Sequence, residues 1–152
     1  MQSENKENTL PRIIAFTGKR GSGKTTLSEK VSLYFPLEFG VEFERMSFAQ
    51  PLREMAAALQ IPYENLYGND YQKGQPIDHL CGASTRHILQ TLGTDWGRTC
   101  IGEDIWVNLM AKRIDQHPKD MSIVIDDLRF PNEADMLREK GALIVRVFDL
   151  SI

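Results

Sequence analysis

The segment Gly18–Thr25, with the sequence GKRGSGKT, constrains the fold of this chain more than any other feature. It follows the apolar, β-branched run 13–17, which predicts a buried strand. It precedes the stretch 25–35, which predicts a helix that ends at Pro36. Glycines in this context let successive backbone N–H groups and the positive end of a helix face an anion. The sequence therefore predicts a Walker A loop that binds the phosphates of ATP, formed by Gly18, Lys19, Arg20, Gly21, Ser22, Gly23, Lys24, Thr25 and Thr26.

Individual residues of this loop have separate expected roles. Lys24 is expected to bridge the β- and γ-phosphates, and the hydroxyl of Thr25 is placed to ligate Mg²⁺. Asp126 follows the apolar strand expected at 121–125 and is the expected Walker B acid, with Asp127 as its close rival. The alternative is that both acids only cap the turn into the next helix.

The rest of the chain alternates between strand and helix patterns. Further strands are expected at 41–48 and 142–148. Helices are expected at 51–59, at 84–92 with Ser84 as the N-cap, after Glu103 and Asp104 through Ile114, and at 132–140 with Asn132 as the cap. Residues 60–83 are rich in Gly and Pro and are expected to leave the core. Strands joined by helical crossovers predict a three-layer α/β P-loop NTPase fold, a mostly parallel sheet with helices on both faces.

Composition narrows the class of protein. The 152 residues, 41% of them hydrophobic, are expected to form one domain at 11–152, after a flexible polar tail at 1–10. A net charge of −3 disfavours nucleic-acid binding, and the apolar runs are far too short to span a membrane. Cys81 and Cys100 lack zinc spacing and read as reduced thiols of a cytoplasmic protein. The sequence leaves open whether the chain forms a homodimer.

Absent motifs exclude other P-loop proteins. GTP-binding switches need a DxxG string and an NKxD string, and neither occurs in this chain. Motor ATPases and helicases usually need a longer core. A small-molecule kinase fits this length better.

Four further stretches carry a resemblance to a known family. They are SFAQPLR at 47–53, TRHILQTLGTDWGR at 85–98, Trp106, and IDDLRFPNE at 125–133. Together they resemble the phage-type deoxynucleoside monophosphate kinases over residues 12–148. The resemblance implies the nucleoside monophosphate kinase fold and transfer of the γ-phosphoryl group of ATP to a deoxynucleoside 5′-monophosphate, in the host cytoplasm if the gene belongs to a phage.

Phosphoryl transfer between two anions needs positive charge on both sides. Lys24, Arg20, Asp127 and Arg129 are the expected catalytic residues. The acceptor is expected to bind in the region of residues 60–100 and at flanking positions, through Ser47, Phe48, Arg53, Arg86, Gln90, Asp95, Trp96, Arg98, Trp106 and Arg129. Arg86 and Gln90 are four residues apart and share one helix face. For any single arginine a solvated surface position is an equal alternative, and an aromatic residue at the helical spacing of Trp106 more often belongs to the core.

The family pattern usually includes a lid segment after the strand that here ends near Phe148, whereas this chain ends at Ile152. Arg20 or the segment 60–83, which holds Lys73 and three tyrosines, is expected to take the part of the lid. A simple surface loop is the alternative for that segment. Two other functions stay open: another small-molecule P-loop kinase, or a catalytically weak nucleotide-binding module that regulates a partner. The preferred base is also left open.

Overall fold

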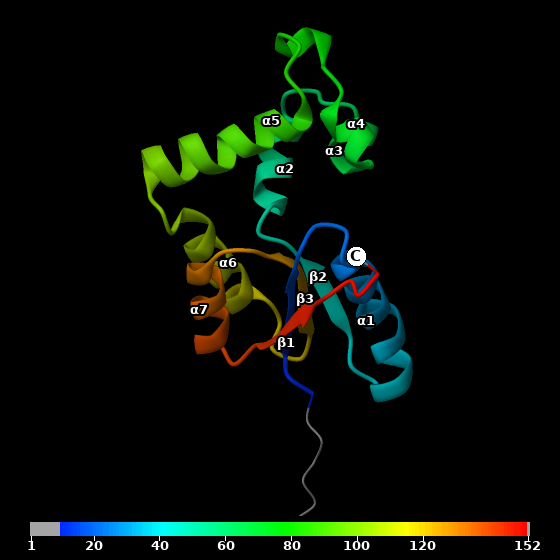
Figure 1. Ribbon diagram of the computed structural model, residues 1–152. Coiled ribbons are helices and arrows are strands. Elements are labelled where there is room, and N and C mark those ends of the chain that lie inside the picture. Colours follow the sequence, from blue (N-terminus) through cyan, green and yellow to red (C-terminus); the bar gives the residue numbers. More distant parts are fainter. Residues whose placement is uncertain (1–9, 152) are drawn as a thin grey trace, which may run out of the picture. The chain divides into compact units, whose positions relative to one another are not determined.

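A computed structural model describes residues 10–151 (Figure 1). The chain divides into two compact units. The sheet unit comprises the residues up to Met46 and those from His117 onward, and the helical unit comprises Ser47–Gln116. Nearly all of the tail expected at 1–10 lies outside the described residues.

The sheet unit is built on four parallel strands. They are β1 (Ile13–Gly18), β2 (Phe43–Met46), β3 (Ser122–Leu128) and β4 (Leu143–Val147). Their order across the sheet is β2-β3-β1-β4, and every neighbouring pair is parallel. The predicted α/β class with a parallel sheet is therefore confirmed. Because β1 lies beside β3, the start of the glycine loop lies next to the two acids near the end of β3.

Helices cover both faces of this sheet. Helix α1 (Lys24–Phe39) lies on one side and α7 (Pro131–Glu139) on the other (Figure 1). On the α1 side Ile14, Phe16 and Val124 pack with Val31 of the helix. The residues between them, such as Ala15 and Ile125, point to the opposite face because strand side chains alternate. Both positions are fully buried, so the sheet carries apolar residues on both sides.

The predicted end of the first helix at Pro36 is wrong, because α1 continues through Pro36 to Phe39. Proline removes one backbone donor and usually disrupts the helix before it. Here the ring of Phe35 packs edge-on against both Phe39 and Phe43, with ring centres 5.2 Å and 5.5 Å apart. This apolar packing compensates for the lost hydrogen bond. The helix ends instead at Gly40, which has the left-handed conformation (φ 65°).

Other boundaries of the sheet unit also differ from the sequence prediction. Strand β2 is only four residues long, and β3 runs three residues further than predicted, to Leu128. Helix α7 begins at Pro131, so Asn132 lies inside its first turn and is not the N-cap. A proline with its fixed φ fits the first helical position well, which explains the earlier start.

The helical unit is wholly helical apart from its connections. Its elements are α2 (Gln50–Ala57), α3 (Tyr63–Tyr67), α4 (Asp70–Gly74), the short helix η1 (Asp78–Leu80), α5 (Thr85–Gln90), the π-helix η2 (Thr91–Ile101) and α6 (Ile105–Gln116). The stretch predicted to be an irregular excursion therefore contains three short helices. Ala56, Ile61, Leu66 and Ile77 form an apolar cluster beneath them, so this segment has a core of its own.

The helix predicted to end at Leu92 continues as η2 to Ile101. Ser84 is its N-cap, as expected, and accepts a hydrogen bond from the N–H of His87 (3.2 Å). In η2 the N–H of Gly102 bonds to the carbonyl of Gly97, five residues earlier (3.0 Å). Such wide turns are rare in proteins as a whole, and those that do occur are frequently found at functional sites. The LGTDWGR string thus forms one continuous helix.

Among residues 10–151 no helix combines the length and the apolar character needed to cross a membrane.

Candidate active site

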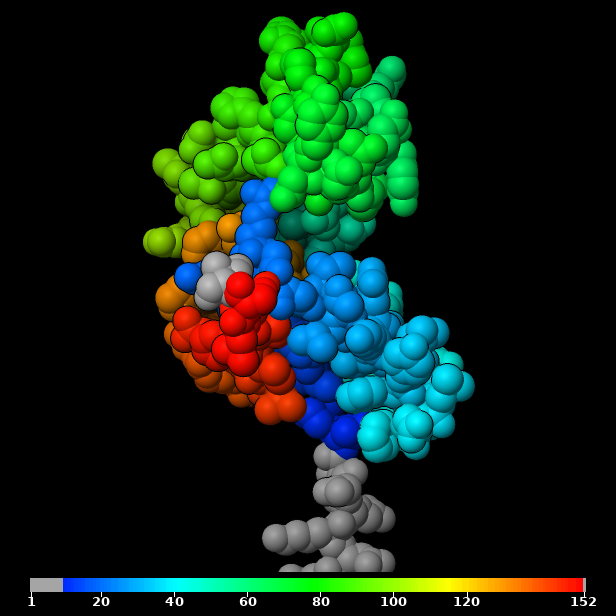
Figure 2. Space-filling model, turned by 45° about the vertical axis from the view of Figure 1, so that its right-hand side comes forward, coloured from blue at the N-terminus to red at the C-terminus, as the bar shows by residue number. Residues whose placement is uncertain are grey.

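The loop after β1 is shaped by its glycines. A Cβ atom on Gly18 would lie 2.5 Å from the carbonyl oxygen of Val147, so no side chain fits there. Gly23 is the N-cap of α1 in the left-handed conformation (φ 101°), which glycine adopts without strain. The loop is exposed at Lys19 and Arg20 and appears as blue atoms on the surface in Figure 2. Its backbone is therefore open to an anion at the start of α1.

Lys24 folds back over this loop. Its Nζ atom donates to the carbonyl oxygens of Gly18 (2.7 Å) and Lys19 (2.9 Å). Burial lowers the pKa of Lys24 below its usual 10.5, and the nearby positive charge of Arg129 lowers it further, while Asp126 and Asp127 oppose the shift. The ammonium group thus lies in a site where one more negative charge would stabilise it.

The two acids of β3 lie at an irregularity in the sheet. Ala15 pairs with Ile125 and Thr17 with Leu128, so Asp126 and Asp127 together face one residue of β1. Such β-bulges change the direction of side chains and are frequent next to active sites. The Oδ2 atom of Asp126 accepts hydrogen bonds from Ser28 (3.0 Å) and from Arg45 (3.1 Å).

Thr25 and Asp126, the residues expected to bind Mg²⁺, are linked in the structure through Ser28. Thr25 is exposed in the first turn of α1, and its carbonyl accepts from Ser28, the residue that also binds Asp126. No cluster of three or more His, Cys, Asp or Glu that could hold a metal occurs among residues 10–151. One hydroxyl and one carboxylate suit Mg²⁺, which usually completes its octahedral shell with water and substrate phosphates.

Ser28 and Arg45 were missed in the sequence. Ser28 lies one helical turn after Lys24, a spacing that could have placed it on the same face of α1. Arg45 is two residues after the buried Phe43 in β2, so both side chains lie on the sheet face that packs against α1. Its contact with Asp126 depends on the pairing of β2 with β3, which no local pattern indicates.

Arg129 begins a rigid turn between β3 and α7. The Oε2 atom of the buried Glu133 accepts from the backbone N–H groups of Arg129 (2.9 Å) and Phe130 (3.0 Å). This carboxylate fixes the turn that carries Arg129. Because the charge of Arg129 acts on the pKa of Lys24, both side chains belong to one electrostatic site in the sheet unit.

The other expected acceptor residues belong to the helical unit, where Arg53 is half-buried. Its Nη1 atom donates to Ser47 (3.4 Å), and its guanidinium lies over the ring of Tyr67, 5.9 Å from the centre. Its Nε atom is buried and has no hydrogen-bond partner among the described residues. A buried donor without a partner costs free energy, which a bound anion would recover.

Arg86 and Gln90 share the exposed face of α5, as their spacing predicts. Arg86 donates to the carbonyl of Asp70 (2.9 Å), and its Nη2 atom lies 3.7 Å from the Asp70 carboxylate. The arginine therefore links α5 to α4. An anion at this position would compete with Asp70.

The aromatic candidates differ in exposure. Trp96 is 41% exposed and lines, with Asp95, an open apolar pocket of about 560 Å³ between α2, α5 and η2. Trp106 is buried, and its indole N–H donates to the carbonyl of Gly93 (2.8 Å). Phe48 is also buried. Trp106 and Phe48 thus contribute to the core of this unit, while Trp96 presents an accessible face.

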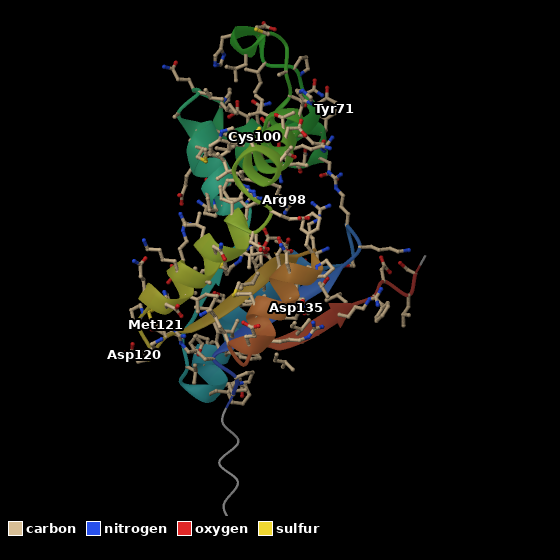
Figure 3. All side chains as sticks on the ribbon, turned by 90° about the vertical axis from the view of Figure 1, so that its left-hand side faces the viewer. Tyr71, Arg98, Cys100, Asp120, Met121 and Asp135 are labelled. Atoms are coloured by element: carbon tan, nitrogen blue, oxygen red, sulfur yellow. The ribbon has the colours of Figure 1, made fainter. Side chains whose placement is uncertain are left out.

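Arg98 lies on η2 with Cys100 (Figure 3) and is half-buried. The sequence-predicted site residues therefore divide between the two units. The loop residues 18–26, Asp126, Asp127 and Arg129 belong to the sheet unit, and the remaining acceptor candidates belong to the helical unit.

Comparisons with known proteins identify the family to which this chain is similar. Residues 77–151 match the family described as deoxynucleotide monophosphate kinase. Over 146 residues the chain is 31% identical to a protein of Acanthamoeba polyphaga mimivirus named as a deoxynucleotide monophosphate kinase, covering 89% of this chain and 72% of that protein. Over 60 residues it is 42% identical to the deoxynucleoside-5′-monophosphate kinase of Escherichia phage T5, which is 40% of this chain and 24% of that enzyme.

Proposed function

The chain belongs to the deoxynucleotide monophosphate kinase family, and we propose that it transfers the γ-phosphoryl group of ATP to a deoxynucleoside 5′-monophosphate, which yields the diphosphate. It is thus a phosphotransferase that acts on nucleotides. The position of Lys24 gives the best support for ATP binding. Its ammonium group is held over the glycine loop by two carbonyl oxygens, and the charges of Asp126, Asp127 and Arg129 act on it.

On the donor side the loop binds the phosphates of ATP. Its backbone N–H groups, from Gly18 to Thr26, contact the phosphate oxygens at the positive end of α1. Lys24 exchanges two neutral carbonyl partners for charged phosphate oxygens, which form stronger hydrogen bonds. Arg20 and Arg129 add positive charge around the transferred group.

Mg²⁺ is the proposed metal, and the residues present fit it. A hydroxyl and a carboxylate are hard oxygen ligands, and Ser28 links the two residues that supply them. Thr25 and Asp126 would hold the ion, whose charge neutralises the β- and γ-phosphate oxygens during transfer. Asp127, beside them on β3, is proposed as a catalytic residue because its charge also acts on Lys24.

On the acceptor side Arg53 is the leading candidate for the monophosphate, because its buried Nε atom has no partner among the described residues. Arg86, Arg98 and Arg129 are proposed to share this role, with Ser47 and Gln90 as polar neighbours. For the base we propose Trp96 and Asp95, which line the apolar pocket of the helical unit. Trp106 and Phe48 support that region from the core.

Three broader expectations remain proposals. The first is that residues 11–152 act as one kinase domain. The second is a cytoplasmic location, which suits the two exposed free thiols of Cys81 and Cys100. The third is that the substrates are small nucleotides and not nucleic acid, whether the protein acts as a monomer or as a homodimer.

Activity can be tested directly with the purified protein. ATP and Mg²⁺ are supplied with each common deoxynucleoside monophosphate in turn, and ADP and the deoxynucleoside diphosphate are quantified. We expect ADP formation with at least one acceptor, and a fall of about 100-fold or more in the Lys24→Ala variant. A wild-type rate equal to that of Lys24→Ala with every acceptor would refute the proposal. Transfer only to an acceptor without a phosphate would identify a different small-molecule kinase.

A further inference from the structure

Among the residues that the structure describes, Arg45 is a cation outside the expected set that contacts Asp126, an expected metal ligand. Its guanidinium is bound on two sides. Nη2 donates to Oδ2 of Asp126 (3.1 Å), and Nη1 lies 3.6 Å from the carboxylate of Glu29 on α1. Arg45 is therefore oriented by two acids from two different elements.

The fold explains why Arg45 reaches Asp126. Arg45 pairs with Val124 across the sheet, two residues before Asp126 on the neighbouring strand. It shares the face of Phe43, which packs toward α1, the helix that carries Ser28 and Glu29. A long side chain at this register spans the end of β3.

The hydrogen bonds of Asp126 engage one of its two carboxylate oxygens. Ser28 and Arg45 both donate to Oδ2, and Oδ1 accepts from none of the described residues. The Arg45 and Asp126 side chains are 42% and 17% exposed, whereas those of the surface pair Arg138–Asp135 are 63% and 71% exposed. Partial burial strengthens a charged hydrogen bond, so this pair constrains the carboxylate more than a solvated pair does.

We propose that Arg45 is a positioning residue for the metal site. It acts through Asp126, whose Oδ2 it holds together with Ser28, so that Oδ1 would be left to the shell of Mg²⁺. Glu29 orients Arg45 and balances its charge. The proposal rests on the proposed function, because it deepens the role of Asp126 in the same site. Groups that hold a metal ligand from outside typically change metal affinity or activity by about 10–100-fold when removed.

The test compares Arg45→Met, which keeps the length of the side chain without its charge, with Arg45→Lys, which keeps the charge. At saturating ATP and acceptor, the Mg²⁺ concentration for half-maximal activity is expected to rise about 10-fold in Arg45→Met and less in Arg45→Lys. Rates at saturating Mg²⁺ are expected to recover substantially. Arg138→Met, which breaks an exposed ion pair in the same unit, is the matched control and should leave the Mg²⁺ dependence unchanged.

A second readout does not need turnover. Calorimetry measures ADP binding with Mg²⁺ and with EDTA. Arg45→Met is expected to weaken binding in Mg²⁺ by about 10-fold and to leave binding in EDTA within about 2-fold. If Arg45 acts through Asp126, adding Arg45→Met to Asp126→Asn should change the Mg²⁺ dependence no further.

The outcomes separate this proposal from the proposed function. An unchanged Mg²⁺ dependence in Arg45→Met, with a clear change in Asp126→Asn, overturns the role of Arg45 and leaves the kinase assignment intact. Equal weakening of ADP binding with Mg²⁺ and with EDTA also overturns it, because Arg45 would then support the loop in general. A wild-type protein without kinase activity refutes the function, while the ADP-binding experiment still tests Arg45. If Arg45→Met does not fold, as judged by its melting temperature, Arg45→Lys and Glu29→Gln carry the same test.

Discussion

The lowered pKa of Lys24 changes the number of protons that the folded protein binds at alkaline pH. The pKa of Lys24 in the folded protein lies below 10.5. At pH values between this lowered pKa and 10.5, Lys24 is therefore protonated less in the folded protein than in the unfolded chain. The cost of charging Lys24 in the fold is thus present at neutral pH and disappears as the pH rises through this window. A bound phosphate reverses the shift, because an anion favours the ammonium form.

We therefore predict that ADP binding takes up protons in that alkaline window. The measurement is calorimetry of ADP binding in buffers of different ionisation enthalpy. The slope of the observed enthalpy gives the number of protons bound, which should be positive for the wild type and near zero for Lys24→Met. Equal slopes for both proteins would show that Lys24 does not contact the phosphates.

Gly97 is needed for its small size. A Cβ atom there would lie 2.5 Å from the ring of Trp106, whose indole is buried and fixed by its bond to Gly93. We predict that Gly97→Ala lowers stability by at least about 1–3 kcal/mol, the usual cost of overpacking a core. The melting temperature is the measurement.

Gly102 provides the matched control for this prediction. It lies at the end of the same helix, its backbone is extended (φ 167°), and an added Cβ meets no atom within 4 Å. Gly102→Ala is expected to change stability by less than about 0.5 kcal/mol. A similar loss in both variants would mean that the contact with Trp106 does not set the cost.

The loop residues show how much of the candidate site can be predicted from the sequence. Gly18–Thr25 was predictable because one contiguous motif brings its own strand and helix. Asp126 was also predictable, because it ends an apolar run. The partners of Asp126 were not, since Ser28 and Arg45 meet it only through the pairing of distant strands and a β-bulge. Trp106 had two readings in the sequence, and its burial places it in the core.

At the scale of elements, α7 depends on one buried carboxylate. Glu133 accepts hydrogen bonds from two backbone N–H groups, those of Arg129 and Phe130, at the start of the helix. Its removal takes away two hydrogen bonds to a charged group, each of which contributes about 1.5–3 kcal/mol. The negative charge also favours the positive end of the helix.

We predict that Glu133→Ala destabilises the protein by about 2 kcal/mol or more, whereas Glu139→Ala, an exposed position in the same helix, has an effect below about 0.5 kcal/mol. Chemical denaturation of both variants checks this. Glu133→Gln should recover part of the loss, because its amide oxygen can still accept. If Glu139→Ala costs as much as Glu133→Ala, the buried hydrogen bonds are not the cause.

Elements with a clear local pattern were predicted well, and those shaped by packing were not. The strands at 13–17 and 142–148 and the helix after Ser84 follow from apolar runs and a cap. The extension of α1 past Pro36 depends on Phe35 packing against β2, which is a tertiary contact. The wide turns of η2 likewise depend on glycines that admit Leu52 and Trp106 to the helix surface. Local preferences at Pro36, Gly93 and Gly97 oppose these structures, so the sequence pattern alone favours shorter helices.

At the scale of the whole molecule, most residues proposed for ATP and most residues proposed for the acceptor belong to different units. The loop, Asp126 and Arg129 belong to the sheet unit, and Arg53, Arg86 and Arg98 belong to the helical unit. The net charge of −3 conceals these local cations, which is why total charge disfavours nucleic-acid binding but says little about nucleotide binding. A two-substrate reaction offers a way to separate the units, since each substrate has its own KM.

Substitution of Arg53 tests whether the two KM values can be changed separately. If its buried guanidinium binds the acceptor phosphate, Arg53→Met should raise the KM for the deoxynucleoside monophosphate by about 10–100-fold, the equivalent of one lost charged hydrogen bond, and leave the KM for ATP within about 2-fold. Arg113→Met is the matched control, because Arg113 belongs to the same unit and pairs with Glu54, the neighbour of Arg53 in the chain. That control should change neither KM. Initial rates measured with each substrate varied in turn give both constants, and a parallel rise in the two KM values for Arg53→Met would assign Arg53 to the stability of the helical unit, with no role at the acceptor phosphate.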